Sequence, residues 1–310
     1  MSLFRSLKVL AITSLATAQL MGCATTGSNT LADRPNCKAG ANGYTQCVVT
    51  TDDGVKIAYK TIGTGKKNLV LVHGWAGAAN NFDEMIKSLD LSAVRAIALD
   101  LRGHGDSDKT ELNYTDERFA KDILAVADDA KAAQFTVLGF SMSGRFVQYV
   151  QLLAPTRVLN QVLVASGPVT AFPLPEPMIA DWVSRVGDIK RLREVPAQFA
   201  VSPNAALLDD YARNAAKVSR TGLEKPLRLS ATSFEAELKA KAPVTRTLCV
   251  AGGGDKMLGT EVQKAICANY AGSKVEVIDN CGHEVLIEKP KELAALVSSF
   301  LGSDSNGPQS

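Results

Sequence analysis

The stretch VLGFSMSG, from Val137 to Gly144, joins an apolar run to the start of a helical pattern. Small residues stand two positions before and two positions after Ser141, at Gly139 and Ser143. This spacing is typical of a tight strand-to-helix turn, where larger side chains would collide. A serine at its apex points out from the strand end, and N–H groups of the following helix can face a developing anion. Ser143 does not fit the apex, because Arg145 would hold its own plus-two position. Ser141 is therefore the candidate nucleophile, a structural Ser/Gly turn being the alternative.

Apolar runs alternate with helical patterns along most of the chain. Such alternation predicts an α/β fold with a mostly parallel central sheet covered by helices on both faces. In open sheets of this kind the functional site lies at the carboxyl ends of the strands. The expected strands are Val48–Thr50, Val55–Ile62, Leu69–Val72, Val94–Leu99, Thr136–Leu138, Val158–Ala165, Leu248–Ala251 and Val275–Ile278.

The strand pattern stops at Pro168 and resumes near residue 243. The segment between is rich in proline at its start and continues with amphipathic helical stretches. It has the size of an insertion, not of an independent domain, and we expect a helical cap over the site. The expected organisation is a signal peptide at 1–22, a lipidated tether at 23–45, the α/β core at 46–167 and 243–302, the cap at 168–242 and a disordered tail at 303–310.

The first residues have the pattern of an export signal. Arg5 and Lys8 precede an apolar stretch, Val9–Leu20, that is too short to span a bilayer as a helix. The stretch ends in LMGC, which resembles the lipobox of bacterial lipoproteins and implies lipidation of Cys23, including palmitate-type chains. Several such chains make an anchor effectively permanent. Ala24 stands where an inner-membrane retention signal would have Asp, so we expect an outer-membrane location in the cell envelope. An ordinary cleaved signal peptide is the alternative.

The composition is that of a globular protein, with 46% hydrophobic and 21% charged residues. A net charge of +2 gives no electrostatic basis for binding nucleic acid. Residues 1–22 hold Arg5 and Lys8 and no acidic residue, so the mature chain is formally neutral. Its membrane contact is therefore expected to come from lipid on Cys23 and not from charge.

The remaining cysteines enter an oxidising compartment if the chain is exported. Cys37 and Cys47 flank a short Gly/Asn-rich turn and are expected to form a local disulfide. Cys267 with Cys281 is the second expected pair, and Cys249, in an apolar run, is expected to be a small buried hydrophobe. The connectivity stays open. No Cys or His spacing indicates a metal site, so no metal or cofactor is expected.

Five ordered motifs together resemble the α/β-hydrolase family, in the branch of small esterases, cofactor-free haloperoxidases and C–C hydrolases. The resemblance covers about Thr50 to Leu301. The motifs are HGWAG (His73–Gly77), DLRGHGDSD (Asp100–Asp108), GFSMSG (Gly139–Gly144), GGGDKM (Gly252–Met257) and CGHEVLIEKP (Cys281–Pro290).

The resemblance implies a catalytic triad in the chain order Ser141, Asp255, His283. It also implies that the backbone N–H groups of Trp75 and Met142 form an oxyanion hole. His73 would orient the loop that carries Trp75.

The side chains of Trp75, Phe140 and Met142 are expected to line an apolar substrate pocket, plain packing being the alternative. Nothing resembles the aspartate nucleophile of dehalogenases and epoxide hydrolases, because Ser141 occupies that position.

The residues themselves point to the same general base. A serine hydroxyl needs a base tuned near working pH, which histidine provides. Of the three histidines, His73 is followed at once by glycine and suits backbone positioning, and His104 lies in a polar turn. His283 remains.

Asp255 follows a run of glycines, so its backbone can approach the histidine loop closely. Some members of the family carry the acid after the sixth strand. Here that place reads Ser166-Gly167-Pro168, with no carboxylate before Glu176, which favours Asp255. The other motif carboxylates are expected to be structural, with Asp100 and Asp106 partnering Arg102 and local turns, and Glu288 likewise structural.

These features predict a serine hydrolase of a small or medium ester, thioester or lactone, working through an acyl-enzyme. Its expected partners are a small-molecule acyl substrate and, through Cys23, a membrane. Acyl transfer and C–C bond hydrolysis by the same residues are variants. A catalytically silent, lipid-anchored binding protein is the alternative from another class.

Overall fold

The computed structural model describes residues 34–241, 243 and 245–303. The signal peptide at 1–22, Cys23, the first part of the tether and residues 304–310 of the tail lie outside the described residues. Among the helices in the described ranges, none is both long enough and apolar enough to cross a membrane.

The described residues form one nine-stranded sheet in the order β1-β2-β3-β5-β4-β6-β7-β8-β9. The strands from β5 through β9 along this order run parallel, and β1, β2 and β3 add an antiparallel edge. The α/β prediction is confirmed. The strands are β1 Cys37–Ala39, β2 Thr45–Thr50, β3 Lys56–Ile62, β4 Lys67–Val72, β5 Val94–Leu99, β6 Phe135–Phe140, β7 Val158–Val164, β8 Arg246–Gly252 and β9 Lys274–Ile278.

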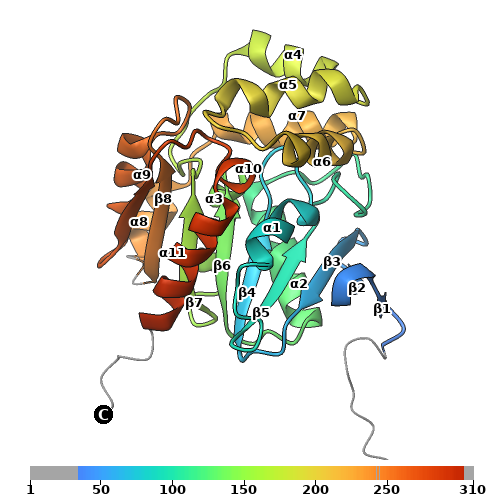
Figure 1. The fold of residues 1–310 in the computed structure, drawn as a ribbon, viewed down its shortest axis with the longest axis vertical. Coiled ribbons are helices and arrows are strands. Elements are labelled where there is room, and N and C mark those ends of the chain that lie inside the picture. The colour runs from blue at the N-terminus through green and yellow to red at the C-terminus, as the bar shows by residue number, and fades with distance from the viewer. Residues whose placement is uncertain (1–33, 242, 244, 304–310) are drawn as a thin grey trace, which may run out of the picture.

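Helices cover both faces of the sheet (Figure 1). Alternate residues of β4 show why: Val70 and Val72 join the core under α2, α3 and α9, whereas Leu69 and Leu71 join the core under α1 and α11. The α-helices are α1 Asp83–Ile86, α2 Asp116–Asp129, α3 Ser143–Leu153, α4 Glu176–Ser184, α5 Ile189–Phe199, α6 Ala205–Ala215, α7 Arg220–Arg228, α8 Glu235–Lys241, α9 Thr260–Cys267, α10 Val285–Glu288 and α11 Pro290–Gly302.

Local sequence explains where α2 begins and which face it buries. The hydroxyl of Thr115 accepts a hydrogen bond from the Arg118 N–H, and acidic residues occupy the first turn. The face of α2 that meets α3 is aromatic, with the Phe119 and Phe146 rings stacked at a centroid distance of 4.1 Å. This contact packs α2 against α3, the helix that follows the nucleophile candidate.

Helices α4 to α7 lie between β7 and β8 in the chain and sit above one end of the sheet (Figure 1). They share an apolar cluster of their own, which includes Trp182, Leu192 and Leu223. Helix α8 differs, because its Leu238 belongs to the core beside α3. Within the predicted cap at 168–242, the last helix therefore packs on the core.

One sequence expectation near the start of the described residues differs from the structure. Part of the predicted tether at 23–45 forms β1, which pairs with β2 so that Cys37 lies opposite Cys47. A disulfide joins these two residues, as expected. The added strand covers the edge of β2, which the sequence pattern gave no reason to expect.

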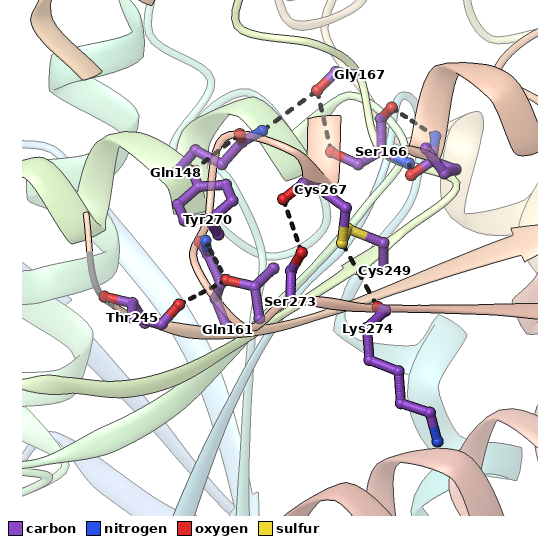
Figure 2. Close-up of a disulfide and its surroundings, with 12 residues drawn as sticks. Gln148, Gln161, Ser166, Gly167, Thr245, Cys249, Cys267, Tyr270, Ser273 and Lys274 are labelled. Atoms are coloured by element: carbon purple, nitrogen blue, oxygen red, sulfur yellow. Dashed lines mark hydrogen bonds between the residues drawn. A yellow bond between two sulfur atoms is a disulfide. The ribbon is translucent and has the colours of Figure 1, made fainter. Parts of the chain in front are cut away.

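The second disulfide joins Cys249 to Cys267 (Figure 2). Cys281 is a free, buried thiol. The predicted Cys267–Cys281 pair is wrong, and so is the prediction that Cys249 stays free. The physical reason is the sheet itself. Cys249 and Cys267 belong to the core on one face, and Cys281 belongs to the core on the other.

Candidate active site

Ser141 lies between β6 and α3 with a positive φ of 54°, a strained conformation for a residue with a side chain. The turn is tight on both sides. A Cβ on Gly139 would lie 2.7 Å from the Ser143 carbonyl oxygen, and one on Gly144 would collide with Ser166. The two glycines therefore permit the close approach that exposes Ser141.

Ser143 takes the plus-two position and contributes its hydroxyl. Its Oγ donates to the carbonyl of Val72 at 2.7 Å and lies 3.0 Å from the N–H of Phe140. Val72 is the last residue of β4, directly before the loop that carries Trp75. The hydroxyl thus ties the nucleophile turn to the start of that loop, which a glycine could not do.

Three loops at the same end of the sheet bring Ser141, Asp255 and His283 together. Ser141 Oγ lies 2.8 Å from His283 Nε2, and His283 Nδ1 lies 2.9 Å from Asp255 Oδ2. The other carboxylate oxygen of Asp255 accepts the N–H groups of Met257 at 2.7 Å and Leu258 at 3.0 Å. Both Asp255 and His283 are buried, so the contact between them is shielded from water, whereas Ser141 is half-buried.

Burial and pairing act in opposite directions on these ionisable groups. Burial lowers the pKa of His283, but the hydrogen bond and negative charge of Asp255, together with the charges of Glu284 and Glu288, more than offset it, and the pKa is raised above the ordinary 6.5. Burial likewise raises the pKa of Asp255, but the hydrogen bond and charge of His283, with two backbone N–H groups, hold it below its ordinary value. The pair favours a charged carboxylate beside a basic imidazole.

His73 and His104 bond to backbone groups. His73 Nδ1 donates to the Gly74 carbonyl at 2.8 Å, and its Nε2 accepts from the Leu101 N–H at 3.0 Å. His104 Nδ1 lies 3.0 Å from the Arg102 carbonyl. Burial lowers the pKa of His73 to about 4 and that of His104 to about 3. Both rings are therefore neutral at physiological pH and hold loops.

The expected partners of Arg102 are wrong. Arg102 is fully buried and bonds Asp122 of α2 at 2.6 Å and Asp53 at 3.0 Å. Its side chain turns toward α2, whereas Asp100 accepts the backbone N–H groups of Ala79 and Asp106. The sequence around Arg102 does not indicate these partners, because Asp53 and Asp122 are distant along the chain.

Glu288 lies near the triad but bonds to backbone. Its carboxylate accepts the N–H groups of Gly282 at 2.9 Å and of Val201 and Ser202 at 2.7 Å. The structural role predicted for Glu288 agrees with these contacts. They fix the loop before His283 to the chain that follows α5.

Trp75 lies in the loop after β4 and is followed by Ala76, which has a φ of +53°. In the described part of the chain, the backbone N–H groups of Trp75 and Met142 donate to no protein acceptor. Met142 directly precedes α3, so its N–H belongs to the positive end of that helix. Both groups remain available to an anion, as the predicted oxyanion hole requires.

An apolar cavity of about 80 Å³ adjoins Ser141. Of the three side chains expected in a substrate pocket, those of Trp75 and Met142 line this cavity. Phe140 does not, because its ring packs beside His283 at a centroid distance of 5.6 Å. The other apolar walls come chiefly from the segment between β7 and β8 and from the loop after β8 that carries Asp255. They are Phe172, Leu174, Trp182, Leu227 and Met257.

Arg145 also lines the cavity, and the sequence gave no sign of it. Its guanidinium makes a two-point ion pair with Asp116, at 2.7 and 2.8 Å, and bonds the Thr232 hydroxyl at 3.0 Å. The positive charge is therefore matched by a carboxylate from α2. The cavity presents no unmatched charge among its described lining residues.

Residues 69–296 match the alpha/beta hydrolase family. The chain belongs to this family. The match and the sheet described above identify it as an enzyme with the α/β-hydrolase fold.

Two relatives and one solved structure are similar to this chain. A 2-hydroxy-6-oxononadienedioate/2-hydroxy-6-oxononatrienedioate hydrolase of Escherichia coli is 26% identical over 80% of this chain and 91% of its own. A non-heme chloroperoxidase of Kitasatospora aureofaciens is 32% identical over 39% of this chain and 44% of its own. An esterase from Exiguobacterium antarcticum superposes with a TM-score of 0.74, covering 82% of this chain and 98% of its own at 22% identity, and shares the fold.

Proposed function

We propose that this protein is a serine hydrolase that cleaves small, uncharged carboxylic esters, with thioesters and lactones in the same class. One observation carries the proposal: Ser141 Oγ, His283 and Asp255 form a continuous hydrogen-bonded chain, with links of 2.8 and 2.9 Å, beside an apolar cavity. This arrangement supplies an activated nucleophile, a base and an orienting carboxylate.

The chemistry follows from the positions of the atoms. Ser141 Oγ attacks the acyl carbon while its proton passes to His283 Nε2. The N–H groups of Trp75 and Met142 face the resulting oxyanion. The imidazolium, stabilised by Asp255, then gives the proton to the leaving alcohol. Water, activated by His283, releases the acyl group and restores Ser141.

The cavity supports a short and uncharged acyl group. It measures about 80 Å³, whereas an apolar cavity of about 150 Å³ is enough for a benzene molecule. We therefore expect acetyl to butyryl groups to fit better than longer chains.

Charge separates this substrate class from that of one relative. The Escherichia coli relative is named for dioate substrates, which carry two carboxylates. The only charged side chain among the described lining residues here is Arg145, and Asp116 already matches it. Burying a substrate carboxylate without a free cationic partner is costly. This disfavours C–C hydrolysis of such dioates.

Labelling with a fluorophosphonate probe tests the nucleophile. The wild-type protein should be labelled and Ser141→Ala should not. Equal labelling of both proteins, or no labelling of the wild type, would overturn the assignment.

p-Nitrophenyl esters test the substrate class. Acetate and butyrate esters should exceed the octanoate ester in kcat/KM. The butyrate ester should exceed the anionic hemisuccinate ester on the order of tenfold or more, because the carboxylate finds no free partner. Absence of any Ser141-dependent turnover, together with tight binding of one ligand, would favour the silent binding protein. Ester formation with an added alcohol in excess of hydrolysis would favour an acyltransferase.

We also propose that Cys23 carries the lipid anchor of an outer-membrane lipoprotein. The support is the sequence LMGC after an export-type stretch. The chain between Cys23 and Cys37 can extend at most about 50 Å, which would keep the enzyme close to the membrane. Growth with an alkyne-tagged palmitate should label the wild type and not Cys23→Ala. Unlabelled wild-type protein in the soluble fraction would contradict the anchor.

A further inference from the structure

Three helices above the sheet hold Trp75, each by a different group. The Tyr211 hydroxyl, on α6, donates to the Trp75 carbonyl at 2.9 Å. The Trp75 indole N–H donates to the carbonyl of Leu223, on α7, at 2.8 Å. The Trp75 ring also packs against Trp182, on α4, with the ring centroids 4.9 Å apart. The backbone and the side chain of Trp75 are thus both fixed from the cap.

The loop needs such support because of its backbone. Ala76 has a φ of +53° and is fully buried, and a residue with a Cβ holds this conformation only where its surroundings enforce it. The Trp75 carbonyl belongs to the peptide unit that joins Trp75 to Ala76. A hydrogen bond to this carbonyl restrains the rotation between the two peptide units of Trp75, and the N–H in the first of them is the one assigned above to the oxyanion hole.

The Tyr211 hydroxyl is suited to act as a permanent hydrogen-bond donor. Its ring is buried against the cap core, and burial raises the pKa of its hydroxyl well above the ordinary value. The hydroxyl therefore stays protonated. Removing the oxygen alone would keep the packing of the ring and take away the bond to Trp75.

We propose that Tyr211 is a positioning residue: its hydrogen bond to the Trp75 carbonyl sets the direction of the Trp75 N–H, so that the oxyanion hole is complete only when the cap is seated. The inference rests on the proposed function, because it assigns that N–H to the oxyanion. It makes the cap part of the catalytic arrangement as well as a wall of the substrate cavity.

The test is Tyr211→Phe in the full chain, assayed with p-nitrophenyl butyrate. Removing one oxyanion donor outright costs about 10²–10³ in kcat, and a misdirected donor should cost less, about 10-fold to 100-fold. KM should stay within about twofold, because a ground-state carbonyl gains little from the hole. Affinity for a butyl boronic acid, which forms a tetrahedral adduct with Ser141, should fall by the same factor as kcat/KM.

Tyr114→Phe is the matched control. The Tyr114 hydroxyl also donates to a backbone carbonyl, that of Thr110, at 2.9 Å, and its ring is similarly buried. Both variants lose a hydrogen bond from a buried tyrosine hydroxyl to a backbone carbonyl, so both melting temperatures should fall. Only Tyr211→Phe should lose kcat and boronate affinity.

The outcomes separate the two proposals. If the wild type shows Ser141-dependent turnover and Tyr211→Phe keeps its kcat, or loses no more than Tyr114→Phe does, Tyr211 is only structural and this inference fails alone. If the wild type shows no Ser141-dependent turnover, the proposed function fails, and this inference fails with it.

Discussion

The side-chain amide of Gln263 bonds both backbone groups of Ser166. Its Oε1 accepts the Ser166 N–H at 3.0 Å and its Nε2 donates to the Ser166 carbonyl at 3.0 Å. The same Nε2 donates to the carbonyl of Leu258 at 2.9 Å. Gln263, fully buried on α9, therefore joins the loop after β7 to the loop that holds Asp255.

This cross-link lies next to both Ser141 and Asp255. The N–H of Gly167 donates to the Ser141 carbonyl at 2.9 Å, and that of Leu258 donates to Asp255. Figure 2 shows Ser166 and Gly167 close to the Cys249–Cys267 disulfide, which fastens α9 to β8. Helix α9 thus holds in place the loop after β8 that carries Asp255.

Gln263→Leu should lower the free energy of unfolding by about 3 kcal/mol, because it leaves buried backbone groups of Ser166 and Leu258 without partners. Urea unfolding measures the change. Gln134→Leu is the control, since Gln134 is exposed and makes one long bond of 3.4 Å, and it should stay within about 0.5 kcal/mol of the wild type. Equal effects of the two variants would contradict the cross-link.

Asp255→Asn should lower kcat on the order of 10⁴-fold, because an amide can turn its N–H₂ toward His283 and impose the wrong tautomer. The fold should persist, since the amide keeps the size of the carboxylate. Steady-state kinetics and circular dichroism measure both. Asp209→Asn, which removes only a surface pair with Arg193, should keep full activity. A folded Asp255→Asn protein with more than a tenth of wild-type kcat would argue against Asp255 as the acid.

The pH profile of kcat/KM should follow the protonation of His283. The general base must be neutral, so kcat/KM should fall as the pH drops through the pKa of His283. Because pairing with Asp255 raises that pKa above 6.5, the midpoint of the acid limb should lie above the value of an ordinary histidine. A midpoint below 6.5 would contradict the pairing.

A substitution at Glu284 should shift the acid limb of the same pH profile. Burial raises the pKa of Glu284 to about 7, and its negative charge contributes to the raised pKa of His283. Glu284→Gln removes that charge, so the midpoint should move to lower pH while the alkaline plateau stays. Glu261→Gln, at an exposed position, should leave the profile in place. A midpoint that rises in Glu284→Gln would show that Glu284 does not act through charge.

The buried disulfide should stabilise the fold. Cys249 and Cys267 are both at most 2% exposed and are separated by 18 residues, and closing a loop near this size is worth about 3 kcal/mol. The double variant Cys249→Ala/Cys267→Ala should lose that amount in urea unfolding. Its kcat should change little while its free energy of unfolding falls, because neither sulfur touches Ser141, Asp255 or His283. An unchanged unfolding midpoint would show that the bond contributes nothing.

The sequence predicted the features that depend on neighbouring residues. Alternating apolar runs identified the parallel strands, because each must be apolar to be buried on both faces. Small residues around Ser141 identified the turn, because its backbone has no space for larger ones. The order of Ser141, Asp255 and His283 followed from motifs that each lie directly after a strand, and the sheet brings those strand ends together.

The partners of buried side chains were decided only by the tertiary structure. Tyr211 and Trp75 are 136 residues apart, and Gln263 and Ser166 are 97 apart, so no local pattern relates them. The same limit explains the wrong partners expected for Arg102 and Cys267. Which face of the sheet a residue reaches depends on how the helices return across it, and that is settled by packing over the whole chain. The sequence therefore indicates which residues are candidates for the chemistry. What holds them in place depends on the packed fold, because buried hydrogen bonds and disulfides form between whichever groups it brings into contact.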